Sequence, residues 1–255
     1  MEANHEAISI RAAGAAQVFV DDPFDPHLAD ADRHHLAKVL RLREGEEVIV
    51  CDGAGRWARR RWAGGQNPLA PLGAASGLGG DGAVSFEDRA EPALTVAFAP
   101  TKGERPEWVV QKLTELGIDR IVPLISERSV VRPKGERGEA MVARLRRVAR
   151  EAAAQCRRVW LPNVTDLIGF ADLPALGVPR SVALAQLSGP QPSRAHSVVA
   201  VGPEGGWSAD ELNSGLPTVG FGLSVLRAET AAVMAGALLV SLRTGTVAAV
   251  GDSPL

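Results

Sequence analysis

The feature that most limits the fold is the alternation of short apolar segments with longer helical segments from about Ala93 onward. The apolar segments are bounded by turn-forming residues, which is typical of buried strands. We expect strands at 94–99, 120–125, 182–185 and 198–201, and a shorter strand near 218–221. We expect helices at 104–116, from 139 to about 156, and at 229–242. This alternation predicts an α/β domain with a mostly parallel sheet and helices on both of its faces.

The helix expected at 104–116 has the clearest boundaries. Pro106 falls in its first turn, where no backbone N–H is needed, and Gly117 is typical of a helix C-terminus. One face of this helix should be apolar and should carry Trp108, Val109, Leu113 and Leu116.

Residues 8 to about 90 are expected to form a small β-rich domain. The segments 46–51 (EEVIVC) and 55–62 (GRWARRRW) flank a turn-rich connection and predict a β-hairpin. Residues 31–40 predict a short amphipathic helix with Leu36, Val39 and Leu40 on one side. The Gly-, Pro- and Ala-rich segment 63–83 is typical of a flexible surface loop, and 83–87 of the domain's last strand.

Composition indicates a protein of the cytoplasm. No apolar run approaches the roughly 18 residues of a membrane span, and the acidic N-terminus lacks the features of a secretory signal. Cys51 and Cys156 lie far apart without metal-ligand spacing, so we expect free thiols in a reducing compartment and no bound metal.

Charge is distributed unevenly although the formal net charge is only −2. Residues 101–160 hold 14 Lys and Arg against 8 Asp and Glu, whereas residues 161–255 hold 4 against 7. Further arginines cluster at Arg56 and at 59–61. This asymmetry suggests a polyanionic partner on one face of the molecule, and solvated helix faces explain it equally well.

The stretch VAVGPEGGWSADEL (199–212) follows a predicted strand and precedes a predicted helix. Ser208 and Glu211 have the spacing of a capping box, so a helix should begin near Ala209. The loop lacks the ending of a P-loop, and the carboxylate of Glu204 would repel a phosphate. Glu204 suits hydroxyls, an amine or a cation, and S-adenosylmethionine offers a ribose and a positive centre. A tight turn with a solvent-facing glutamate is the alternative.

A second stretch, GLSVLRAETA (222–231), joins apolar residues to the start of the last predicted helix. Its apolar side chains could form a dry slot for adenine. Arg227, Glu229 and Thr230 then bring a cation, an anion and a hydroxyl to the mouth of a buried helix. An ordinary helix start with an internal Arg–Glu pair is the alternative.

Five segments of the chain, taken together, resemble a known family. They are HHLAKVLRLREGEEVIVCDGAGR (34–56), TKGERPEWVVQKLTELGIDRIVPLISERSVVR (101–132), REAAAQCRR (150–158), VGPEGGWSADEL (201–212) and LSVLRAETAAVMA (223–235). The chain resembles the SPOUT-class RNA methyltransferases, specifically the 16S ribosomal RNA uridine-N3 methyltransferases of the RsmE type. The resemblance implies a PUA-like β-barrel for RNA at 1–90 and a methyltransferase domain with a trefoil knot at 91–255. It also implies a homodimer that uses S-adenosylmethionine.

Carried over motif by motif, the resemblance implies three loops that hold the cofactor. The loops and the start of the last helix contribute Leu184, Ala185, Gly202, Pro203, Glu204, Gly205, Gly206, Leu223, Val225, Leu226 and Thr230. The loop after Ala185 departs from the family, because Gln186 stands where an acidic or His-containing turn is common.

For the chemistry, we expect Arg227 to stabilise negative charge on the uracil carbonyl oxygens, and Glu229 or a water to take the proton from N3. Because N3 lies on the pairing edge, the base must be unpaired or extruded. The residues expected to meet RNA phosphates are Arg41, Arg43, Arg59, Arg60, Arg61, Arg128, Arg132, Arg150 and Arg157.

Two other functions remain open at this stage. A non-catalytic RNA-binding or ribosome-assembly factor could keep the same fold, and Gln186 is the feature that favours it. A nucleotide-binding enzyme could use the glycine loop for phosphate, and Glu204 argues against it.

Overall fold

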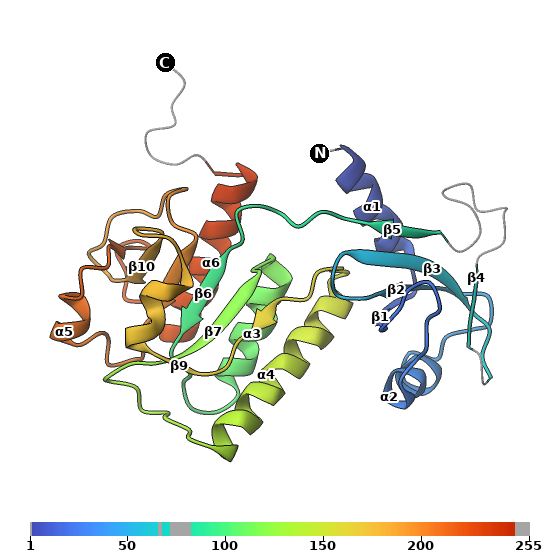
Figure 1. The fold of residues 1–255 in the computed structure, drawn as a ribbon, viewed down its shortest axis with the longest axis horizontal. Coiled ribbons are helices and arrows are strands. Elements are labelled where there is room, and N and C mark those ends of the chain that lie inside the picture. The colour runs from blue at the N-terminus through green and yellow to red at the C-terminus, as the bar shows by residue number, and fades with distance from the viewer. Residues whose placement is uncertain (1, 66–67, 72–82, 248–255) are drawn as a thin grey trace. The chain divides into compact units, whose positions relative to one another are not determined.

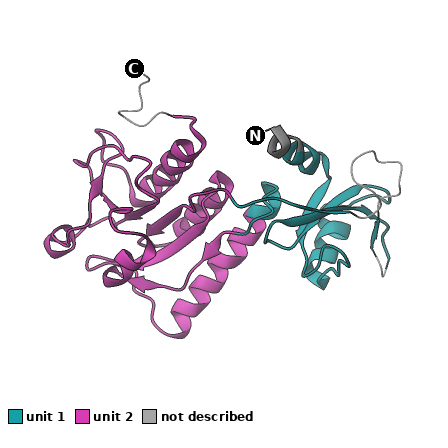
Figure 2. Ribbon diagram, turned by 45° about the horizontal axis from the view of Figure 1, so that its top comes forward, with its two compact units in different colours: residues 1–89, 153–161 teal, residues 90–152, 162–255 magenta. Residues whose placement is uncertain are grey.

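The computed structural model describes residues 2–65, 68–71 and 83–247, and the chain forms two compact units. One comprises Met1–Arg89 and Ala153–Leu161, and the other comprises Ala90–Ala152 and Pro162–Leu255 (Figure 2). Most of the loop expected at 63–83 lies outside the described residues. The expectation of a loop is wrong for Leu69–Pro71, which forms strand β4.

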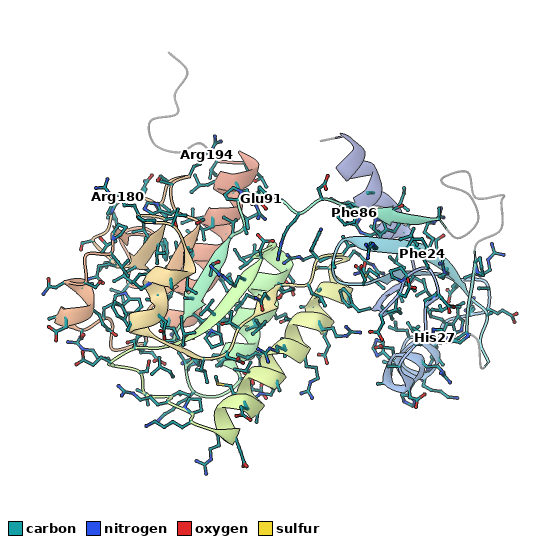
Figure 3. All side chains as sticks on the ribbon, viewed as in Figure 1. Phe24, His27, Phe86, Glu91, Arg180 and Arg194 are labelled. Carbon is teal, nitrogen blue, oxygen red and sulfur yellow. The ribbon has the colours of Figure 1, made fainter. Side chains whose placement is uncertain are left out.

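The first unit is built on a five-stranded sheet, as the β-rich pattern predicted. Its strands are β1 (Ala16–Phe19), β2 (Glu47–Cys51), β3 (Arg56–Trp62), β4 (Leu69–Pro71) and β5 (Val84–Phe86). β2 and β3 form the predicted antiparallel hairpin, and β1 joins β2 in parallel. Both β4 and β5 pair with β3. On β5, Phe86, which is labelled in Figure 3, meets Trp160 edge-on, with ring centroids 6.2 Å apart.

The helices of this unit differ from expectation. Helix α1 (Glu2–Ala13) was not predicted, and its Ala7 and Ile10 pack against the core on one side of the sheet. The helix expected at 31–40 is α2 (Asp30–His34) followed by a π-helical turn, η1 (His35–Val39).

That π-helical turn alters which side chains are buried. The N–H of Leu40 bonds to the carbonyl of His35, five residues back, and this wider turn rotates the chain away from an α-helical spacing. Leu36 is therefore fully buried, whereas Val39 and Leu40 are 60% and 46% exposed, so the predicted face is wrong for these two residues.

The second unit contains the predicted parallel sheet, of which Figure 1 labels β6, β7, β9 and β10. Its strands lie in the order β12-β10-β11-β6-β7-β8, with β9 beside β7. All six pairings are parallel. The strands are β6 (Thr95–Phe98), β7 (Arg120–Ile125), β8 (Asn163–Val164), β9 (Ile168–Gly169), β10 (Val182–Ala185), β11 (Val198–Val201) and β12 (Thr218–Val219). The helices are α3 (Arg105–Leu116), α4 (Glu136–Gln155), α5 (Ala209–Leu212) and α6 (Ala228–Thr244), with a 3-10 helix, η3 (Phe170–Leu176).

The two faces of this sheet are covered differently. Alternate strand residues such as Val96 and Val199 pack under α3, α4 and α6. Their neighbours Ala97 and Ala200 face the opposite side, where η3 and Trp207 cover them. Successive strand residues point to opposite faces, so both faces of the sheet need cover. Long helices cover one face and shorter elements cover the other.

Helix α3 shows how the local signals act. Pro106 lies at its start, and Gly117 ends it with a left-handed φ of 98°. Val109 and Leu113 are buried as predicted, but Trp108 is 44% exposed, so the predicted apolar face is wrong at that position. Val110 is buried instead, which turns the apolar face toward α6 and the sheet.

The sequence also led to expectations about the two cysteines and about membrane-spanning segments. Cys51 and Cys156 remain thiols and do not form a disulfide. Within the described part of the chain, no helix has both the length and the apolar composition needed to cross a bilayer.

Candidate active site

A pocket of about 400 Å³ opens at the carboxyl ends of three adjacent strands. The chain leaves β10, β11 and β12 there, and the loops that follow these strands form its walls. Ligands in open parallel sheets bind at this edge. The lining residues are Ala185, Gln186, Leu187, Val201, Gly202, Pro203, Glu204, Gly206, Trp207, Phe221, Gly222, Ser224, Val225, Leu226, Arg227, Ala228 and Ala231.

Trp207 joins two of these walls. Its indole N–H donates to the carbonyl oxygen of Ala185 at 2.9 Å, which ties the loop after β11 to the end of β10. A Cβ atom on Gly202 would lie 3.1 Å from the indole ring, so a larger residue at this position would require the ring to shift by a few tenths of an ångström. Gly206, with a φ of 68°, makes the turn that returns the chain toward Trp207.

The predicted capping box closes the same loop. The hydroxyl of Ser208 accepts from the N–H of Glu211, and Glu211 accepts from the N–H of Ser208 at 2.9 Å. The second oxygen of Glu211 accepts from the N–H of Glu127 at 2.9 Å. The carboxylate therefore fastens the start of α5 to the segment after β7.

The structure brings most of the predicted cofactor residues to one cavity. Those that line the pocket are Ala185, Gly202, Pro203, Glu204, Gly206, Val225, Leu226 and the predicted catalytic residue Arg227. Gln186, which departs from the family pattern, also lines it. The two glycine-containing stretches thus line one pocket.

Five predicted residues lie outside the pocket wall, and each has a clear position. Leu184 is fully buried inside β10, and Leu223 is fully exposed. The carbonyl of Gly205 accepts from Arg128 at 3.0 Å. Thr230 is exposed on α6, and Glu229, beside it, is mostly buried with a side chain 13% exposed.

An ionic cluster that sequence reasoning missed lies beside the pocket. Arg105, the first residue of α3, reaches two predicted site carboxylates. Its Nη1 is 3.8 Å from Oε1 of Glu204, and its Nε is 3.6 Å from Oε1 of Glu229. The only local signal was its place in TKGER, directly after the strand that neighbours β11.

Arg227 presents a positive charge to the pocket. It occupies the N-cap position of α6, and its side chain is exposed among the lining residues. No carboxylate of the described residues forms an ion pair with it. A guanidinium in this position can stabilise negative charge that develops on a ligand in the pocket.

The arginines expected to meet RNA fall into two groups. Arg41, Arg43, Arg61, Arg128, Arg132 and Arg150 are exposed. Arg59 forms a two-point ion pair with Glu47, whose hydrogen bond raises the pKa of the Arg59 guanidinium. Arg157 is half-buried and donates to the carbonyl of Gly14 at 2.8 Å, and burial lowers its pKa.

The expectation is wrong for Arg60, which is only 3% exposed. Its guanidinium donates to the carbonyl of Pro23 at 2.6 Å and to the carbonyls of Phe24 and Arg59. Burial lowers the pKa of Arg60. The side chain is a structural support for the loop around residue 23 and is not accessible to a phosphate.

The chain is similar to RNA methyltransferases over most of its length. The profile of the RNA methyltransferase domain family matches residues 89–240, and that of the RNA methyltransferase PUA domain matches residues 28–59. The ribosomal RNA small subunit methyltransferase E of Synechocystis is 33% identical over 231 residues, covering 84% of this chain and 72% of its own length. The protein of the same name from Mycobacterium bovis is 31% identical, covering 79% of this chain and 80% of its own length.

Solved structures share the fold. A ribosomal RNA small subunit methyltransferase E from Neisseria gonorrhoeae, solved bound to S-adenosyl methionine, aligns with a TM-score of 0.70 and 24% identity. The alignment covers 89% of this chain and 97% of that one. This similarity shows that the chain shares the fold of that structure.

Proposed function

Because the chain belongs to the RNA methyltransferase domain family that includes the ribosomal RNA small subunit methyltransferases E, we propose that it methylates N3 of a uridine in 16S ribosomal RNA. The methyl donor is S-adenosylmethionine. The observation that carries this function is the convergence of the two glycine-containing stretches on one pocket at the carboxyl edge of the sheet.

The pocket suits the donor in size and chemistry. A volume of about 400 Å³ lies in the range of small-molecule sites. Val225 and Leu226 offer an apolar wall for adenine, while Glu204 faces the cavity with a negative charge. A carboxylate accepts hydrogen bonds from ribose hydroxyls and attracts a sulfonium or an amine. When bound, S-adenosylmethionine supplies an electrophilic methyl group on a positively charged sulfur.

The chain contributes alignment and electrostatics to the transfer. Holding donor and acceptor in line accounts for much of the acceleration in such a displacement. With the donor bound, transfer would join N3 of uracil to the methyl carbon, and the donor sulfur would keep the electron pair of the broken carbon–sulfur bond. Arg227 stabilises the negative charge that moves onto the uracil carbonyl oxygens as N3 loses its proton.

The proton from N3 passes to water in this proposal. Glu229 was the other candidate acceptor, but it does not line the pocket and its carboxylate is paired with Arg105. Arg227 lines the pocket and is itself exposed to solvent, so a water can reach the base beside it. The uridine must leave its stack to present N3, because that atom lies on the pairing edge.

We also propose the finer features that the family resemblance implies. These are a trefoil knot, a homodimer, a PUA-like β-barrel, and action in the cytoplasm. Support for the knot comes from the strand order β12-β10-β11 and from the close crossing of the chain at Gly189 and Gly220, where a Cβ on Gly220 would lie 2.4 Å from the Gly189 carbonyl. Support for the homodimer comes from Leu223 and Val225, which are 102% and 84% exposed.

We propose separately that the exposed arginines contact the RNA backbone. Arg41, Arg43 and Arg61 serve on the first unit, and Arg128, Arg132 and Arg150 on the second. Gly205 and Leu223 keep a role in cofactor binding through the shape of the loops and not as pocket walls. Leu184 in β10 and Thr230 in α6 act through the strand and the helix that carry those loops. Arg59 and Arg157 contribute only if they release their present partners.

Two measurements test the function. Calorimetric titration with S-adenosylhomocysteine should give stoichiometric binding, and a non-catalytic RNA-binding factor predicts none. Mass spectrometry of 16S ribosomal RNA from cells with and without the gene should show one 3-methyluridine that depends on the protein. A protein that binds the nucleoside but leaves the RNA unchanged would refute the proposed reaction.

A further inference from the structure

Arg105 is the positively charged residue that contacts both Glu204 and Glu229. It begins α3, directly after the turn at Gly103, whose φ is 78°. Strand β6, which precedes that turn, is the parallel neighbour of β11. Arg105 therefore reaches the edge of the pocket from the loop after β6, in addition to the loops after β10, β11 and β12.

The two carboxylates that Arg105 contacts have different surroundings. Glu204 is 46% exposed and lines the pocket. Glu229 is 13% exposed and lies on the first turn of α6, outside the pocket wall. One oxygen of Glu229 is buried without a hydrogen-bond partner among the described residues. Glu229 therefore acts as a fixed anchor for the guanidinium, whereas Glu204 faces the ligand.

Charge in the pocket depends on this cluster. Glu204 and Arg227 are the two charged residues among the described residues that line the cavity. Arg105 lies 3.8 Å from Glu204 and offsets part of its negative potential. The methyl donor and its demethylated product differ by one positive charge, since transfer converts a sulfonium into a neutral thioether. A change in the field of Glu204 must therefore act differently on donor and product.

We propose that Arg105 is a positioning and specificity-determining residue that sets how strongly the pocket prefers the cationic donor over the neutral product. Glu229 holds the guanidinium at the rim, and the guanidinium weakens the pull of Glu204 on the sulfonium. The preference of the pocket for the cationic donor therefore stays moderate, so that the donor binds and can still be released. This inference rests on the proposed methyltransferase function and names a property of the same pocket.

The test compares dissociation constants of S-adenosylmethionine and S-adenosylhomocysteine, measured by calorimetry at low salt on the full chain. Arg105→Gln should raise the ratio of the product constant to the donor constant by about three- to tenfold, because the carboxylate is no longer offset. Glu204→Gln should lower that ratio below the value for the unchanged protein. Arg105→Lys keeps the charge and should restore most of the original ratio.

Lys112→Gln supplies the matched control. Lys112 lies on the same helix and pairs with Glu115, so the variant removes one positive charge from α3 away from the pocket. Its ratio should stay within about twofold of the original, as expected for a screened surface charge. Arg128 and Arg227 are present in every variant, so their charges cancel in the comparison.

Each outcome has one meaning. If the unchanged protein binds neither nucleoside, the proposed function fails. If it binds both, and Arg105→Gln alters the two constants by the same factor, Arg105 has only a structural role and the inference is wrong. A larger ratio in Arg105→Gln, reduced again by Arg105→Lys, supports it. Thermal unfolding of each variant identifies any that fails to fold. If Arg105→Gln is one of them, Glu204→Gln decides the question, because a ratio that does not fall in that variant shows that the charge of Glu204 does not distinguish donor from product, and the inference is then wrong.

Discussion

Replacing Glu211 by glutamine tests how the glycine loop is fastened. The carboxylate of Glu211 is 5% exposed and accepts from the backbone N–H groups of Ser208 and Glu127, each at 2.9 Å. Glutamine has the same shape but carries one acceptor oxygen and one amide donor. One of the two N–H groups must therefore face another donor, in a site that solvent hardly reaches.

The magnitude follows from these two bonds. A hydrogen bond to a charged group contributes about 1.5–3 kcal/mol, and leaving a buried donor unsatisfied costs about 1–3 kcal/mol. Since glutamine keeps one of the bonds, we expect Glu211→Gln to lower the free energy of unfolding by about 2–4 kcal/mol. The loss should be accompanied by faster amide exchange at residues 202–213, where the loop and α5 are fastened.

Urea-induced unfolding and hydrogen exchange measure the two effects, and Asp210→Asn is the control. Asp210 is exposed in the first turn of the same short helix, so its replacement removes an equal charge but no buried bond. We expect that control to cost no more than about 1 kcal/mol, the usual contribution of a charge at a helix N-terminus. A Glu211→Gln protein within about 0.5 kcal/mol of Asp210→Asn would refute the reasoning.

Three further predictions use other parts of the molecule. Gly220→Ala should destabilise the protein by more than about 2 kcal/mol in urea unfolding, because its Cβ would lie 2.4 Å from the Gly189 carbonyl; a smaller loss would show that the crossing can open. Arg60→Gln should cost about 2–4 kcal/mol, whereas Arg61→Gln should leave stability nearly unchanged and reduce the salt dependence of RNA binding; equal stability losses would contradict the burial of Arg60. Burial lowers the pKa of His196 in the folded protein below 6.5. As pH drops, His196 therefore binds a proton in the unfolded protein before it does so in the folded protein. The free energy of unfolding should consequently fall as pH drops from about 6.5 through the lowered pKa. His196→Gln should flatten that slope in unfolding experiments at pH 5–7, and an unchanged slope would assign it to other groups.

The strands and helices of the second unit were predictable because each carries its own signal. Val198–Val201 is a short apolar segment, and Ser208 with Glu211 forms the capping box that its spacing indicated. Such signals depend on neighbours within a few residues. The parallel sheet then follows from alternation of strands and helices, since parallel neighbours need a crossover.

The misplaced elements depend on contacts that a local pattern does not contain. The π-helical turn at 35–39 places Leu36 alone in the core, although an α-helical period grouped it with Val39 and Leu40. Arg60 stands in an arginine run that resembles a surface patch, yet strand alternation turns it inward between Arg59 and Arg61. Its carbonyl partner at Pro23 is 37 residues away along the chain.

The site shows the same division between local and distant causes. The loop at 202–206 and the bend at 222–227 carry recognisable chemistry, but their meeting depends on β10 lying between β11 and β12. Strand order brings the carboxyl ends together, and the bond from Trp207 to Ala185 then holds two loops at a fixed spacing. Arg105 arrives from a further strand and sets the charge of the wall that these loops form. Short motifs thus supply the groups that touch a ligand, while the order of the strands determines which groups act on it together.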